Sequence, residues 1–316
     1  MHTGIRNDAV VKRKTAGYAR VSTDSEEQLT KPFMKFAMPI QKVLLKCVKV
    51  PKNLASSVLK ISGYKGNPFQ AEFFEPVQQQ KPLPCVLMIH GGAFGMMASP
   101  HHKKLVIRYA QELGCKVLFP DYHLMPEYPY PAGKEDVLSC YRYLCEHKDK
   151  LGIDMNRIAV AGDSAGAVLA VYVAQFDWKE MSSPCGQMLV YPVADAGQKT
   201  KSMQEFTDTP MWNAKSNAKM WEWYLADTAE NEKQNASPMT SSLKEKIPPT
   251  YIETAEYDCL RDEGLLYAER LKCNGADVTV HETKGTIHGY DFRLKSKITE
   301  KSISKRIAFL KRVFKI

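Results

Sequence analysis

The sequence predicts an α/β fold with a mostly parallel central sheet and helices on both faces. Short apolar runs alternate with stretches of ~10–15 residues that suit helices, which is the pattern of βαβ units. Glycine-rich turns follow two of these runs, at 90–95 and 162–166. A polar and aromatic segment, 195–247, then interrupts the alternation and predicts a helical insertion over one end of the sheet.

The first half of the chain supplies the opening elements. From Lys31 the apolar side chains fall near helical spacing, interrupted by Pro39, and 69–76 alternates like a half-exposed strand. The expected order beyond it is a strand at 85–89, a helix at 101–113, a strand at 116–119 and a helix at 133–148.

The second half continues the same alternation. A helix is expected directly after the glycine turn at 162–166, and strands are expected at 157–161, 187–191, 250–254 and 277–281. The final segment places Ile303, Ile307, Leu310 and Phe314 on one helical face, with lysines and arginines opposite. This pattern predicts a last helix that packs on the sheet, and a helix lying on a membrane surface is the alternative.

Composition narrows the class of protein. Of the 316 residues 44% are apolar and 25% charged, the ordinary mix of a soluble globular protein. No apolar stretch suits a spanning helix or a secretory signal, so we expect a cytoplasmic protein. The eight cysteines form no CxxC pair and no metal-ligand spacing, which predicts reduced thiols. The net charge of +9 comes from both terminal segments, and the mildly acidic middle argues against a nucleic-acid-binding body.

The turn GDSAG at 162–166 carries the first chemical signal. It is a G-x-S-x-G sequence between an expected strand and an expected helix, and small residues flank the serine because such a turn crowds the backbone. The turn exposes the Ser164 hydroxyl at the carboxyl end of the strand. The Ala165 amide and the helix N-terminus favour negative charge at the same point. Ser164 is therefore the predicted nucleophile.

A second turn, HGGA at 90–93, follows the strand at 85–89. Consecutive glycines let backbone N–H groups face a ligand without a Cβ in the way. The amides of Gly91 and Gly92, together with that of Ala165, are predicted to form an oxyanion hole.

A nucleophilic serine needs a base, and the base needs an orienting acid. Asp258 follows the strand at 250–254 and His288 follows the strand at 277–281, so both lie where an open α/β sheet places its site. Asp262 and Glu263 compete for the acid role, and Asp258 is preferred because it comes first after the strand. His288 fits best among the eight histidines, because it follows the serine and lies in a loop next to a glycine.

These motifs together resemble a known family. The segments HGGAF, DYHLMPEYPYPAGKEDV, RIAVAGDSAGA, YPVAD, DCLRDE and HGY, in this order, resemble the hormone-sensitive-lipase family of α/β-hydrolases, on its bacterial acetyl-esterase-like side. The similarity covers about residues 35–316. It implies the α/β-hydrolase fold, with a hydrolase domain at 31–316 and a helical cap from about 31–60 and 195–240.

The resemblance also implies roles for individual residues. Ser164 would be the nucleophile, Asp258 the acid and His288 the base. The oxyanion hole would use the amides of Gly91, Gly92 and Ala165. Ala93 stands where many members have a third glycine, a departure from which we expect little loss.

The family implies hydrolysis of short-chain carboxylic esters through an acyl-enzyme, without a metal or cofactor. An amidase, deacetylase or peptidase with the same triad is the alternative. A non-catalytic binder is a third reading, since plant gibberellin receptors resemble the family but lack the triad histidine, which His288 supplies here. Aromatic residues in the cap favour small acyl groups. We expect a small-molecule ester as the partner, no nucleic acid and no stable membrane insertion, and a homodimer is compatible with the family.

A separate resemblance covers the start of the chain. Residues 16–30, AGYARVSTDSEEQLT, resemble the beginning of a serine recombinase catalytic domain, in which Arg20 and Ser22 would match the catalytic arginine and nucleophile. A recombinase needs a much longer domain, whereas here the hydrolase begins immediately afterwards. We therefore expect 1–30 to be a fused leader without recombinase function, and a chain beginning near Lys31 to keep hydrolase activity.

Overall fold

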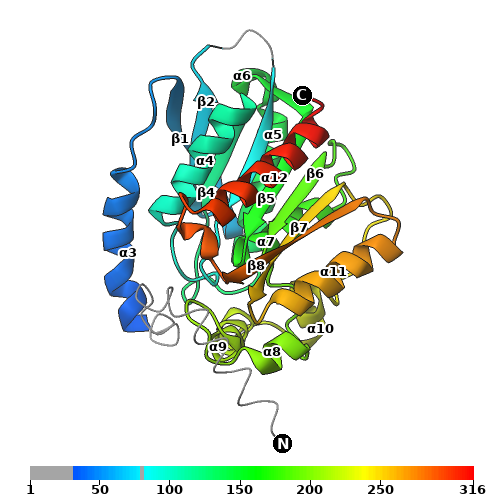
Figure 1. Cartoon of the computed structure of the whole chain (residues 1–316). Helices are drawn as coiled ribbons and strands as arrows, with labels where there is room; N and C mark the ends of the chain where they lie inside the picture. Colours follow the sequence, from blue (N-terminus) through cyan, green and yellow to red (C-terminus); the bar gives the residue numbers. More distant parts are fainter. Residues whose placement is uncertain (1–30, 79–81) are drawn as a thin grey trace, which may run out of the picture.

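The computed structural model describes residues 31–78 and 82–316 (Figure 1). Its strands form one sheet in the order β1-β2-β4-β3-β5-β6-β7-β8. The pairs β1–β2 and β2–β4 are antiparallel, and every other neighbouring pair is parallel. The strands are β1 (Leu54–Ser62), β2 (Pro68–Pro76), β3 (Leu83–Ile89), β4 (Lys116–Asp121), β5 (Ile153–Asp163), β6 (Gly186–Val190), β7 (Thr250–Tyr257) and β8 (Val278–Ile287).

Helices cover both faces of this sheet. On one face lie α4 (Pro100–Leu113) and α12 (Lys297–Phe314), which cross in front of the strands in Figure 1. The opposite face carries α5 (Ala132–Glu146), α7 (Ala165–Gln175) and α11 (Arg261–Cys273). The layered α/β fold predicted from the alternation of strands and helices is confirmed.

The two hydrophobic cores follow from the alternation of side chains along the strands. In β3, Val86 and Met88 point into the core beneath α4 and α12, whereas Leu87 and Ile89 point into the core beneath α5 and α7. Residues 165–174 of α7 are all buried, which matches their apolar and small side chains on every face of the helix. Burial on both sides of the central strands fixes where their carboxyl ends lie.

The first strand of the sheet is the element that the sequence pattern does not predict. β1 is an edge strand in which only Leu54 and Ile61 are buried, so its alternation of apolar and polar residues is weak. The expected cap range of 31–60 is therefore too long: residues 54–60 pair with β2 in the sheet. Its first part is helix α3 (Lys31–Lys46), which contains Pro39 and packs against α4.

The expected insertion lies between β6 and β7 and is helical in short pieces. It contains α8 (Lys201–Glu205), α9 (Ala214–Tyr224), α10 (Glu230–Lys233) and the 3₁₀ helix η2 (Gln234–Ala236). In Figure 1 these elements lie beyond one end of the strands. The remaining short helices are α6 (Lys148–Leu151), η1 (Tyr64–Gly66) and η3 (Tyr290–Phe292).

Helix α12 packs on the sheet, as the amphipathic pattern predicts, because Ile303, Ile307, Leu310 and Phe314 are all buried. Among the described helices, none has the length and hydropathy to cross a membrane. All eight cysteines lie in the described part and none forms a disulfide. The segment that resembles a recombinase, residues 1–30, lies outside the described residues.

Candidate active site

Ser164 occupies the sharp turn between β5 and α7. Its backbone has φ 54° and ψ −122°, a region that a residue with a side chain adopts only under strain. The flanking glycines permit the turn, since a Cβ on Gly162 would lie 2.2 Å from the Gly166 carbonyl oxygen. The Ser164 amide donates to the Val190 carbonyl at 2.8 Å, which ties the turn to the end of β6. The local structure thus presents the hydroxyl at the carboxyl edge of the sheet.

The structure brings Ser164, His288 and Asp258 together in one hydrogen-bonded chain. His288 Nε2 lies 2.9 Å from Ser164 Oγ, and His288 Nδ1 lies 2.7 Å from Asp258 Oδ2. The Asp258 carboxylate is fully buried, and its other oxygen accepts the Leu260 amide at 3.0 Å. These distances suit proton transfer from a hydroxyl to an imidazole that a carboxylate orients.

The two competing carboxylates point elsewhere. Asp262 accepts the backbone amide of Ser202 and pairs with Arg261, while buried Glu263 accepts the amide of Ala194. Both therefore hold the insertion against α11. Asp258 is the acidic residue in contact with His288.

Aromatic rings hold the imidazole of His288 on two sides. The Tyr191 ring lies 4.6 Å from it between centroids, and the Trp212 ring lies 6.0 Å away. Tyr191 follows β6 with φ 35°, and its hydroxyl donates to Asp291 Oδ1 at 2.6 Å. Sequence reasoning assigns Tyr191 no role, although Tyr191 opens the YPVAD segment of the family resemblance.

The structure corrects one predicted member of the oxyanion hole. The Gly91 amide donates to Asp163 Oδ1 at 3.1 Å, so it is already occupied. By contrast, the amides of Gly92 and Ala93 have no acceptor among the described residues, and both residues line the pocket with Ser164. The Ala165 amide, first in α7, has no intrahelical acceptor either. The three available amides are those of Gly92, Ala93 and Ala165.

Asp163 explains why the turn at 90–93, called the oxyanion turn below, offers the amides of Gly92 and Ala93 instead of those of Gly91 and Gly92. Its Oδ1 accepts the Gly91 amide and its Oδ2 lies 3.2 Å from His102 Nε2. His102 Nδ1 accepts the Ser99 amide at 3.0 Å, so the Nε2 atom carries the proton and donates to Asp163. Burial favours a raised pKa for Asp163, but His102 and its neighbouring histidines hold that pKa below the ordinary range. A carboxylate fixed in this way joins the oxyanion turn to the turn at 162–166 that carries Ser164.

Two further histidines surround the turn and remain neutral near pH 7. Burial, with a smaller contribution from His102, lowers the pKa of His90 to about 4 and that of His101 to about 3. His90 Nδ1 donates to the Gly91 carbonyl at 2.7 Å, and its ring stacks on Tyr122 at 4.5 Å between centroids. His90 therefore shapes the backbone of the turn rather than acting as an acid or base.

A pocket of about 190 Å³ opens over Ser164. The oxyanion turn, His288, Met211 and Trp212 line it, and helix α3 contributes Gln41. Within the described residues no group of three or more His, Cys, Asp or Glu side chains could hold a metal ion. This volume corresponds to roughly six water molecules.

The fold and the strand–serine–helix turn define an α/β-hydrolase. The sequence pattern of the family Abhydrolase_3, described as an alpha/beta hydrolase fold, matches residues 86–292. The chain belongs to this family. The predicted resemblance to hormone-sensitive-lipase-like hydrolases is thereby confirmed.

Several similar proteins are esterases. The chain is 37% identical to esterase LipI of Mycobacterium tuberculosis over 214 residues. These residues cover 67% of each chain. It is 32% identical over 247 residues to carboxylesterase NlhH of the same species, covering 76% of each. An ethyl acetate hydrolase of Pseudomonas putida is 29% identical over 238 residues, which cover 74% of this chain and 75% of that one.

Solved structures of esterases resemble nearly the whole chain. A bacterial heroin esterase superposes with a TM-score of 0.83 at 26% identity, covering 96% of this chain and 97% of the other. A thermostable esterase from Pseudomonas putida ECU1011 also has a TM-score of 0.83, at 25% identity, covering 96% and 98%. The family and these neighbours support an esterase-type hydrolase.

Proposed function

We propose that this protein hydrolyses short-chain carboxylic esters through a covalent acyl-enzyme, with Ser164 as nucleophile. The observation that carries the proposal is the chain of contacts from Ser164 Oγ through both ring nitrogens of His288 to the buried Asp258. The esterase relatives support the same type of reaction.

The reaction begins when His288 takes the proton of the Ser164 hydroxyl and the serine oxygen attacks the ester carbonyl. Asp258 keeps the proton of the imidazole on Nδ1 and so leaves Nε2 free to accept. The amides of Gly92, Ala93 and Ala165 donate to the oxygen of the tetrahedral intermediate, and losing one such donor typically costs ~10²–10³ in rate.

The intermediate collapses when His288 gives its proton to the leaving alcohol, and the acyl group remains on Ser164. Water then attacks the acyl-enzyme, with His288 as base, and releases the carboxylic acid. The pocket of about 190 Å³ favours acetyl to butyryl groups over long chains.

The test is hydrolysis of 4-nitrophenyl esters from acetate to decanoate by wild type and Ser164→Ala. We expect the rate to peak at acetate or butyrate and to fall by roughly 10⁴ or more in the variant, with an unchanged melting temperature. Equal rates in both proteins would contradict the nucleophile assignment. A folded wild type that cleaves acyl 4-nitroanilides, such as 4-nitroacetanilide, but none of the esters would favour an amidase.

A further inference from the structure

A second cavity, larger than the catalytic pocket, lies between α3 and the loop after β4. Its volume is about 520 Å³, against about 190 Å³ for the pocket over Ser164. We call it the Asp121 cavity, and its walls come from Met38 and Lys42 of α3, from Met97 and from residues 121–128. It is in the size range of binding sites for small molecules.

The Asp121 cavity adjoins the catalytic pocket. Met97 lines both, and the two neighbouring α3 residues Gln41 and Lys42 face one cavity each. The loop that forms the far wall is joined to the oxyanion turn, because the Met125 amide donates to the Phe94 carbonyl at 2.9 Å. The two cavities are therefore neighbours with Met97 at their shared wall.

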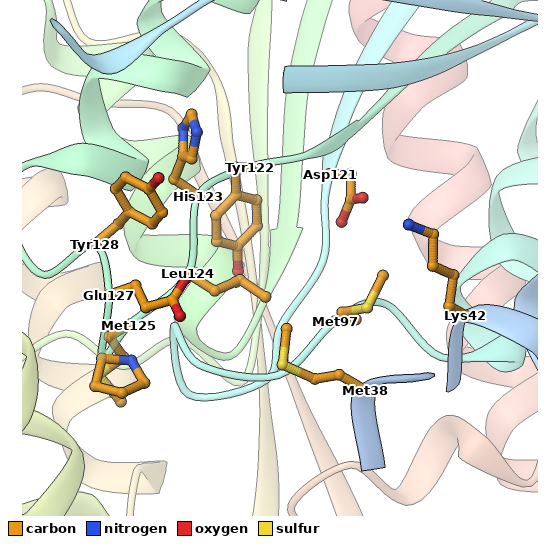
Figure 2. Close-up of a pocket in the computed structure, with 11 residues that line it drawn as sticks. Met38, Lys42, Met97, Asp121, Tyr122, His123, Leu124, Met125, Glu127 and Tyr128 are labelled. Atoms are coloured by element: carbon orange, nitrogen blue, oxygen red, sulfur yellow. The ribbon is translucent and has the colours of Figure 1, made fainter. Parts of the chain in front are cut away.

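Three charged side chains line the Asp121 cavity. Figure 2 shows Lys42 extending from α3 toward Asp121 at the end of β4, with Glu127 on the opposite side and Met38 and Met97 between them. Within the described part of the chain, none of these three charged side chains has a hydrogen bond or an ion pair. All three are exposed to solvent, and the Lys42 ammonium acts electrostatically on the Asp121 carboxyl, so a ligand can reach them by displacing water.

The wall that carries these groups is firmly built. Buried Asp136 of α5 accepts the His123 amide at 2.7 Å, contacts the His123 ring at 2.8 Å and accepts the Tyr64 amide at 2.8 Å. The Tyr128 ring lies against His123 at 4.3 Å between centroids. These contacts anchor the loop directly after Asp121, which ends β4, and both Asp121 and Glu127 are exposed to solvent.

We propose that the Asp121 cavity receives the alcohol portion of the ester and that this portion carries several hydroxyl groups. The inference rests on the proposed esterase function and specifies its substrate class. Carboxylates accept hydrogen bonds from hydroxyls and an ammonium group donates to them, so this set suits a neutral polyol. A plain alkyl alcohol forms no hydrogen bonds with these three groups, whereas several hydroxyls can engage the two carboxylates and the ammonium together. The substrate is thus a small acyl ester of a polyhydroxylated alcohol.

The experiment compares two acetates that differ chiefly in their hydroxyl and ether oxygens. Methyl 6-O-acetyl-α-D-glucopyranoside and cyclohexylmethyl acetate both place the ester on a CH₂ group attached to a six-membered ring. We expect kcat/KM of the wild type to be at least about tenfold higher for the sugar ester. Asp121→Ala and Glu127→Ala should each lower this ratio about tenfold, mainly through KM, as expected for one lost charge-assisted hydrogen bond.

A matched control is Glu146→Ala, which removes an exposed carboxylate at the end of α5 and should keep the wild-type ratio. A ratio near one in the wild type, unchanged in the cavity variants, would overturn the proposal. Faster hydrolysis of acetylcholine than of the sugar ester would also overturn it, in favour of a cationic alcohol. In both cases, cleavage of 4-nitrophenyl acetate would leave the esterase function standing.

Binding to the inactive Ser164→Ala variant gives an independent readout. Calorimetric titration with the sugar acetate should show saturable binding that weakens about tenfold when Asp121→Ala is added. Absence of binding to the single variant would refute the assignment of the cavity even if the wild type proved to cleave another bond.

Discussion

The Tyr191 ring lies against the His288 ring, with 4.6 Å between centroids, while its hydroxyl donates to Asp291 Oδ1 at 2.6 Å. Asp291 is in turn held by Arg306 Nη1 at 2.7 Å, and Arg306 also binds Glu253. This buried network runs from the sheet and α12 to the candidate base. Arg306 and both carboxylates are almost completely buried, so the network orients Tyr191 through paired charges with little freedom.

The network predicts that Tyr191 positions His288. Tyr191→Phe keeps the ring but releases it from Asp291, so we expect kcat to fall about fivefold to tenfold with little change in KM. Tyr290→Phe is the matched control, because the Tyr290 hydroxyl also donates to a carboxylate bound by Arg306, at 2.6 Å from Glu253. Both variants should lose ~1–3 kcal/mol of unfolding free energy. Equal losses of kcat in the two variants would contradict the positioning role.

Asp163 is predicted to support catalysis by holding the oxyanion turn. Asp163→Ala removes the acceptor of the Gly91 amide, which frees the turn that carries Gly92 and Ala93. We expect kcat for 4-nitrophenyl acetate to fall by ~10², comparable with the loss of one oxyanion donor. Asp163→Asn keeps an oxygen for the Gly91 amide and should lose less. A wild-type kcat in the alanine variant would contradict this role. Single-turnover measurements would show whether the acylation step itself has slowed.

The close approach of Gly166 to the end of β3 predicts intolerance of a side chain. A Cβ at this position would lie 2.3 Å from the Ile89 carbonyl oxygen and 2.5 Å from that of His90. Because backbone cannot move aside cheaply, Gly166→Ala should cost about 3 kcal/mol in denaturant unfolding and should abolish activity. Gly133→Ala is the control: its nearest contact would be 3.4 Å, and it should stabilise α5 by ~0.5–1 kcal/mol. Similar stabilities of the two variants would be inconsistent with the crowded turn.

Buried His90 predicts a loss of stability in mild acid. Its pKa is about 4 in the folded protein and near 6.5 in the unfolded chain, mainly because of burial. Between these values the unfolded chain binds a proton that the folded protein does not, so the unfolding free energy decreases as the pH falls through this window. The full loss at pH 4 is about 3 kcal/mol.

The measurement is the melting temperature of wild type and His90→Asn from pH 7 to pH 4. Buried Glu263, whose pKa is raised by burial, acts in the opposite direction, so the difference between the two proteins isolates His90. The wild type should show the steeper decline and take up more protons on unfolding at pH 5.5. Identical pH dependence in the two proteins would refute the prediction.

Sequence reasoning succeeded where the signal is local. The apolar runs of β3 to β7 are buried on both faces of the sheet, so each is recognisable without knowledge of its neighbours. Edge strand β1 is half exposed and passed unrecognised. Ser164, Asp258 and His288 were predicted from their places after strands, because the carboxyl ends of parallel strands meet at one edge. The structure brings these three side chains into contact.

What the sequence alone determined is the order of elements from β2 onward, the hydrolase family and the identity of the three side chains that meet at the turn after β5. The tertiary structure decided which backbone amides are available, because the acceptor of the Gly91 amide is the side chain of Asp163, 72 residues further on. It also decided that Tyr191, Asp291 and Arg306 form one network and that Lys42 faces Asp121 across a cavity. These relationships depend on distances between segments that are remote in the chain, and residue spacing along a sequence does not encode such distances.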